Sequence, residues 1–113
     1  MRRALLAALV SAYGCTTHDT GSKATDAWAG RWNGPEGTYL AIAGSGGVYE
    51  ITIKDLDAAR TFSGSAAGGR IEFRRDGVME QIAATNGDAT GMKWLAGKTN
   101  CLTIKAGEGY CRD

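Results

Sequence analysis

Glu80 is the carboxylate whose place in the sequence is best suited to chemistry. The pair Asp76-Gly77 predicts a two-residue hairpin turn, because glycine readily takes positive φ. This register pairs Phe73 with Glu80 and puts the carboxylate on the apolar face of the hairpin. A carboxyl group there could donate a proton or contact a ligand. A longer turn or a bulge would move Glu80 to solvent, and that is the arrangement we favour from the sequence.

Other catalytic constellations are missing from the sequence. The sole histidine, His18, lies in a polar segment, so the chain lacks a Ser-His-Asp set. No zinc signature occurs, and we expect no metal and no cofactor. Sequence does not fix distances, so a carboxylate pair such as Glu80 and Glu108 stays open, and it would suit a small hydrolase. We expect a protein that is not an enzyme.

A second candidate site combines aromatic side chains with lysines near the C-terminal end. Its members are Lys93, Trp94, Lys98 and Tyr110. Aromatic groups beside cations could bind a protein or glycan ligand, because aromatic residues anchor interfaces. The alternative, which we favour, makes Trp94 and Tyr110 part of the core and the lysines solvated guards of a strand edge.

Two cysteines, Cys101 and Cys111, are spaced for a disulfide across a hairpin. If residues 105–107 form a three-residue loop with Gly107 in the left-handed conformation, the two cysteines lie directly opposite each other. Neighbours at this position are within disulfide reach. The bond would stabilise the fold by roughly 2–3 kcal/mol in the chain-entropy model, and it requires an oxidising compartment.

The N-terminal residues follow the order of a secretory signal peptide. Arg2 and Arg3 are followed by an apolar run over 4–10 and by small residues up to Cys15. The apolar run is far shorter than the roughly 20 residues that span a bilayer. We therefore expect residues 1–14 to be cleaved rather than to form a transmembrane helix.

The segment Ala12-Tyr13-Gly14-Cys15 resembles a bacterial lipobox, in which the cysteine carries the lipid. Thr16 in the next position resembles lipoproteins sent to the outer membrane. The resemblance implies lipidation of Cys15, with a palmitate among its acyl chains, in a small Gram-negative outer-membrane lipoprotein. Its membrane contact would be the lipid anchor, and the domain would face the periplasm or the cell surface.

Charge excludes one class of partner. The chain has 13 basic and 12 acidic residues. Loss of Arg2 and Arg3 with the signal peptide leaves 11 basic residues and a net charge of −1. No basic excess remains, so we do not expect nucleic acid as a partner. Residues 15–27 are polar and lack apolar periodicity, and we expect them to form a flexible tether before one domain over 28–113.

From Trp28 onward the apolar residues alternate with period two between turn residues. Sequential hairpins with short loops favour an all-β antiparallel meander of about eight short strands, forming a small barrel or a strongly curved sheet. The expected strands cover 38–43, 48–54, 60–65, 70–74, 78–84, 89–95, 100–105 and 108–112.

Gly30-Arg31-Trp32 resembles the Gly-x-Trp opening of lipocalin-like and avidin-like barrels. The resemblance implies a barrel in which Trp32 closes one end. Because the chain is shorter than a typical lipocalin, the interior would hold little beyond its own side chains.

A small disulfide-bonded β-domain on a lipid tether resembles, in architecture, the lysozyme-inhibitor lipoproteins. The Ser-Gly-x-x-Tyr loop of one such family would need tyrosine after Ser63-Gly64, where this chain has Ala67. We expect a non-enzymatic binding or inhibitor module at the outer membrane. A structural or assembly lipoprotein of an envelope complex and a small carboxylate-dependent hydrolase are the alternatives.

Overall fold

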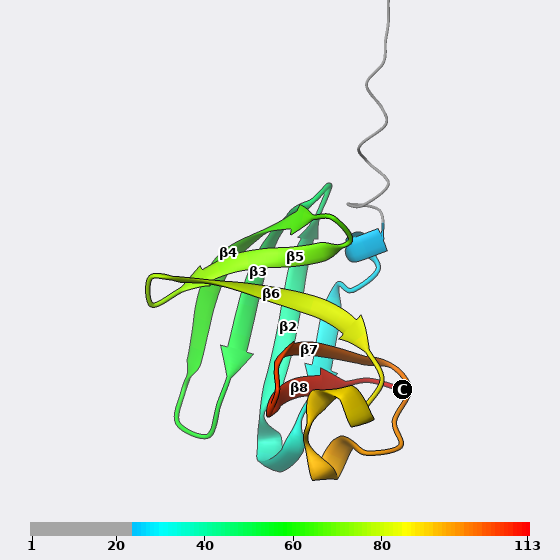
Figure 1. Ribbon diagram of the computed structural model, residues 1–113. Coiled ribbons are helices and arrows are strands. Elements are labelled where there is room, and N and C mark those ends of the chain that lie inside the picture. The colour runs from blue at the N-terminus through cyan, green and yellow to red at the C-terminus, as the bar shows by residue number, and fades with distance from the viewer. Residues whose placement is uncertain (1–23) are drawn as a thin grey trace, which may run out of the picture.

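The domain is a closed barrel of eight antiparallel strands joined in sequence order, as a computed structural model describes it for residues 24–113 (Figure 1). The all-β meander predicted from the sequence is confirmed. The expected signal peptide, Cys15 and most of the expected tether lie outside the described residues. No helix within residues 24–113 has the length and apolar character needed to cross a bilayer.

Each strand pairs with the next one along the chain, and the ring closes where Asn33 of the first strand pairs with Cys111 of the last. The strands are β1 (Gly30–Asn33), β2 (Tyr39–Ser45), β3 (Val48–Lys54), β4 (Ala59–Ala67), β5 (Arg70–Arg75), β6 (Val78–Thr85), β7 (Cys101–Lys105) and β8 (Glu108–Cys111). Three short 3₁₀ turns accompany them: η1 (Pro35–Gly37), η2 (Asp88–Thr90) and η3 (Lys93–Leu95).

The strand expected over 89–95 is wrong, and the strand β1 was missed. The segment folds into η2 and η3 because its polar side chains bind the local backbone. Asn86 accepts the N–H of Ala89, and Thr90 donates to the carbonyl of Gly87. Such bonds compete with strand pairing, and the apparent alternation in this segment is coincidental.

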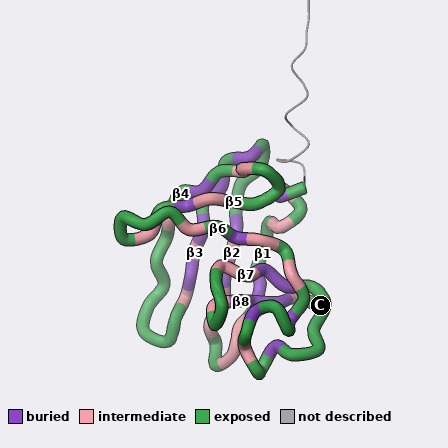
Figure 2. Tube along the Cα trace, viewed as in Figure 1, coloured by how far each residue is buried: buried purple, intermediate pink, exposed green. Residues whose placement is uncertain are grey.

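Buried and exposed residues alternate along the other strands (Figure 2). The buried ones are apolar and form the core of the barrel. The buried set consists of Trp32, Leu40, Ile42, Tyr49, Ile51, Ile53, Ile71, Phe73, Ile82, Leu102 and Tyr110. Gly64 of β4 faces this core, and a Cβ at that position would lie 2.4 Å from Cδ1 of Ile51. A larger residue at this point of β4 would therefore require the side chain of Ile51 to shift.

Trp32 and Arg112 hold the first described residues of the chain against the barrel. The indole Nε1 of Trp32 donates to the carbonyl of Trp28 at 2.8 Å, and the guanidinium of Arg112 lies 3.9 Å above the indole ring. Arg112 also donates to the carbonyls of Ala27 and Ala29. A cation stacked on an aromatic ring and bonded to the backbone fixes the N-terminal turn on the sheet.

A polar clasp formed by Thr25, Asp26 and Tyr49 joins the same turn to the β2–β3 hairpin. Thr25 is fully buried and bonds the hydroxyl of Tyr49 at 2.6 Å. Asp26 accepts from that hydroxyl at 2.5 Å and from the N–H groups of Gly46 and Gly47. The folded domain thus begins before Trp28, because residues expected in the tether pack onto the barrel.

The disulfide between Cys101 and Cys111 is present, with the two residues directly opposite in the β7–β8 pair. The hairpin differs in detail from the three-residue loop expected. Lys105 pairs with Glu108 across a two-residue turn, and an irregularity between Thr103 and Lys105 restores the register. A bulge absorbs the extra residue, so the cysteines still meet.

Candidate functional site

A cavity of about 480 Å³ opens at the barrel end opposite the clasp, which we call the mouth cavity. Its volume falls within the range of roughly 300–1,000 Å³ that small-molecule sites occupy. The apolar lining includes Pro35, Ile53, Leu56, Phe62 and Met92. The polar lining includes Glu36, Asp55, Arg60, Arg75, Lys105, Glu108 and Tyr110.

Strand alternation explains why charged side chains point inward here. Arg75 follows the buried Phe73 by two residues, and Glu80 precedes the buried Ile82 by two. Glu108 stands in the same relation to Tyr110. Residues two apart in a strand share a face, so the inward row changes from apolar to charged as each strand reaches the mouth.

Arg75 of β5 holds together two carboxylates from different strands. Its Nη1 and Nη2 donate to both oxygens of Glu108 at 2.6 and 2.8 Å, and its Nη2 and Nε donate to Glu80 at 2.9 and 3.2 Å. Paired N–H donors on a carboxylate give strong, directional binding. The bonds from Glu108 raise the pKa of Arg75 above its usual value despite partial burial, so Arg75 stays cationic.

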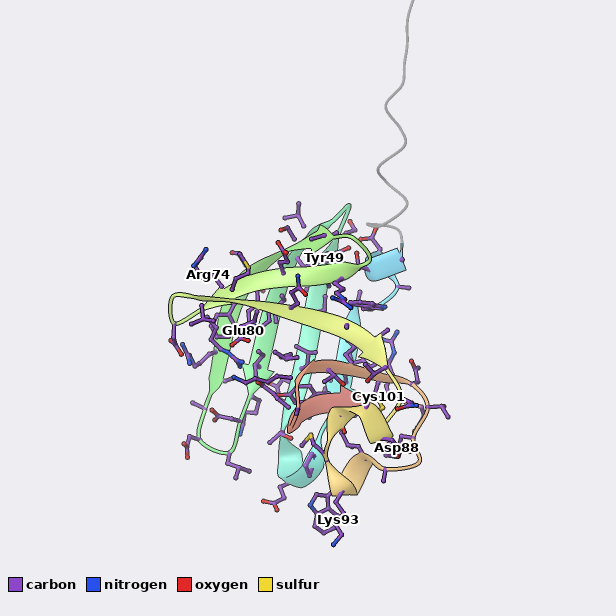
Figure 3. All side chains as sticks on the ribbon, viewed as in Figure 1. Tyr49, Arg74, Glu80, Asp88, Lys93 and Cys101 are labelled. Carbon is purple, nitrogen blue, oxygen red and sulfur yellow. A yellow bond between two sulfur atoms is a disulfide. The ribbon has the colours of Figure 1, made fainter. Side chains whose placement is uncertain are left out.

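The position of Glu80 corrects the arrangement favoured from the sequence. The two-residue turn at Asp76-Gly77 forms with positive φ at both positions, and Phe73 pairs with Glu80. Only 14% of the Glu80 side chain is exposed, so the expectation that it faces solvent is wrong. Its partner Arg75 was missed from the sequence, although Arg75 lies two residues after Phe73 on the face that also carries Glu80. Figure 3 shows Glu80 beside this hairpin.

Tyr110 lies in the core and lines the mouth cavity. The residue is 5% exposed, and its hydroxyl makes no hydrogen bond to any residue within 24–113. Burial, followed by the negative charge of Glu108, raises its pKa to about 12. The hydroxyl is therefore neutral near pH 7 and offers the cavity one donor and one acceptor.

A second hollow, of about 490 Å³, adjoins the mouth cavity. Arg60, Arg75, Lys105 and Glu108 line both spaces, and Glu80 lines the second. The ion-paired cluster of Arg75 with its two glutamates therefore borders both. Lys105 extends the cluster outward, with its Nζ 3.8 Å from Glu80.

The four residues of the second candidate site, which was predicted from the sequence, do not lie together. Tyr110 lies inside the barrel, whereas Trp94 is 73% exposed on the 86–100 connection and does not belong to the core. Lys93 and Lys98 are exposed, and Lys93 lies at the edge of the molecule, far from Glu80 (Figure 3). Trp94 and Lys98 line a separate hollow of about 300 Å³ on the outer surface.

These features define a small antiparallel barrel that is closed by the clasp at one end and hollowed into a cup at the other. Among residues 24–113, no group of three or more His, Cys, Asp or Glu residues is arranged to hold a metal ion. No protein-family model, curated protein or solved structure matches the chain. Function must therefore be inferred from the residues of the cup.

Proposed function

We propose that this chain is a non-enzymatic binding module whose ligand, a small molecule, occupies the mouth cavity. The observation that carries the proposal is a cavity of about 480 Å³ that is lined by apolar side chains and by the buried residue Tyr110. Small-molecule sites combine such walls with a few fixed polar groups. Arg75 forms ion pairs with both Glu80 and Glu108. This pairing supports a structural role for the two carboxylates rather than a catalytic role in hydrolysis.

Binding of a neutral probe, 4-phenylbutan-1-ol, to the purified full chain tests this proposal. We expect its amide chemical-shift changes to cluster at residues that line the mouth cavity. Leu56 is 66% exposed on the cavity rim, so Leu56→Ala should weaken binding about threefold without unfolding the domain.

Val48→Ala is the matched control, because Val48 is an equally exposed apolar residue on the β2–β3 hairpin at the clasp end. The control should bind the probe as the parent does. Shift changes centred on the β2–β3 hairpin, or no saturable binding at all, would contradict a ligand site at the mouth.

The proposal extends to an outer-membrane lipoprotein that is lipidated at Cys15 after removal of a signal peptide. Its support is the lipobox-like sequence together with the disulfide, which suits an exported domain. The described chain begins at the clasp end. An anchor preceding it would attach the domain by the end opposite the mouth.

Metabolic labelling with a palmitate analogue, followed by mass spectrometry of the mature N-terminus, tests the anchor. The parent chain should be labelled and should fractionate with membranes, whereas Cys15→Ser should be unlabelled. Recovery from cells of a chain that retains Met1 and an unmodified Cys15 thiol would refute this part of the proposal.

A further inference from the structure

The basic groups of the mouth are already bound to carboxylates. Arg60 donates to Asp76 at 2.6 and 3.3 Å, and Arg75 donates to two glutamates. Lys105 is mostly exposed and lies near one of these glutamates. An anionic ligand would therefore have to compete with ion pairs that exist within the protein.

Two acidic groups of the mouth cavity are available to a ligand. Asp55 uses one oxygen, Oδ1, to accept the N–H groups of Asp57 and Ala58, and these bonds keep its pKa below the usual range. Glu36 makes no hydrogen bond or ion pair with any residue from 24 to 113. Both carboxylates line the cavity.

Glu36 also has an unusual backbone. Its φ is +59°, in the left-handed region that residues other than glycine, asparagine and aspartate rarely adopt. A glutamate held in this conformation at a cavity rim is a sign of functional constraint. The neighbouring Gly37 has φ +83°, and Glu36 lines the mouth cavity.

The hydroxyl of Tyr110 is an independent sign of a ligand. Buried polar groups in proteins nearly always have a hydrogen-bond partner. This hydroxyl has none among the described residues, although the side chain is about nineteen-twentieths buried. Because Tyr110 lines the cavity, a polar atom of a ligand bound there would supply that partner.

We infer that the ligand is a small amphipathic amine whose ammonium group faces the carboxylates of Glu36 and Asp55. This inference rests on the proposed function. Its apolar body packs against Ile53, Phe62 and Met92. The hydroxyl of Tyr110 binds a polar atom of that body. The charges lining the two adjoining hollows support a cation, because acidic side chains outnumber basic ones.

Three probes with one apolar body and different head groups test the inference: 4-phenylbutylamine, 4-phenylbutan-1-ol and 4-phenylbutyrate. Calorimetric titration of the full chain near pH 7 should give the amine an affinity about tenfold higher than that of the acid, with the alcohol between them. If the acid binds as tightly as the amine, the charge preference is wrong and the proposed cavity function stands. If none of the three binds, both proposals fail.

The variant Glu36→Gln tests whether the preference for the amine arises at Glu36, because it removes one charge without altering the barrel core. It should weaken the amine about threefold and leave the alcohol unchanged. Glu50→Gln removes the same charge from an exposed site on β3 near the clasp end and should change neither affinity. Equal weakening by the two variants, or no effect of Glu36→Gln, would overturn a direct contact with Glu36.

Discussion

At the scale of the residue, Arg75 unites three strands through two carboxylates. Glu80 lies five residues away in sequence and Glu108 lies 33 residues away. The three side chains are each less than one-fifth exposed. Removing one member of such a group leaves the charges of the others unpaired in a partly buried site. The resulting loss of folding free energy is far larger than the net stabilisation that the intact group provides over apolar residues in its place.

We expect Arg75→Met to lower the free energy of unfolding by about 2–3 kcal/mol, somewhat less than for a fully buried pair because water reaches the edge of the cluster. Arg74→Met is the matched control, since Arg74 is exposed on the outer face of the same strand (Figure 3). It should cost under about 0.5 kcal/mol. Urea denaturation measures both, and equal losses would contradict the structural role of Arg75.

At the scale of the element, the β7–β8 hairpin closes the barrel. Cys111 both bonds Cys101 and pairs with Asn33, which is the single registered contact between β8 and β1. The disulfide therefore stabilises the strand on which closure depends. Most of its effect should come from restricting the unfolded chain over a separation of 10 residues.

The double variant Cys101→Ser with Cys111→Ser should fold, but with a free energy of unfolding lower by about 2–3 kcal/mol. Dithiothreitol should destabilise the parent by a similar amount and leave the double variant unchanged. Amide hydrogen exchange should accelerate first in β1 and β8. Uniform acceleration in all eight strands would show that closure does not depend on this hairpin.

At the scale of the whole molecule, the barrel has a packed middle between a clasped end and an open mouth. Gly64 lies at a close approach in the interior, where β4 passes Ile51 and Ile71. Added volume in a close-packed core forces neighbours off their preferred rotamers. The cavity therefore does not extend through the barrel, and the mouth is a cup rather than a channel.

Gly64→Ala should destabilise the domain by about 1–3 kcal/mol, because its Cβ would meet Cδ1 of Ile51. Ile51→Val removes that carbon and by itself should cost roughly 0.5–1.5 kcal/mol. The double variant should be more stable than the sum of the two losses predicts. Additive losses in a double-mutant cycle of thermal or urea unfolding would exclude this contact as the cause.

The clasp gives the folded state a pH dependence in acid. Hydrogen bonds from Tyr49, and then from the N–H of Gly46, hold the pKa of Asp26 below its usual value of 3.8. A depressed folded-state pKa gives stability that is complete well above 3.8 and is lost as pH falls through the lower folded value. Asp26→Asn should therefore flatten the fall in unfolding free energy below about pH 5. An unchanged acid limb would show that Asp26 does not contribute to it.

The alternation of apolar residues and the cysteine spacing were enough to predict the meander and the disulfide, whereas the observed register of β5 with β6 was the arrangement that the sequence analysis did not favour. These features are local, because period and turn type act within one hairpin. The strand expected over 89–95 failed because side chains such as Asn86 bind the nearby backbone, which the apolar pattern does not reveal.

The residues that meet at the mouth cavity could be identified only from the tertiary structure. The sequence left two positions open for Glu80 and favoured the solvent-facing one, and only closure of the barrel brings Glu108 of β8 to Arg75 of β5. The same closure moves Tyr110 into the cavity and leaves Trp94 outside. The physical reason is that charge pairing and cavity shape depend on distances between strands far apart in the chain, whereas periodicity fixes only which face of its own strand a side chain takes.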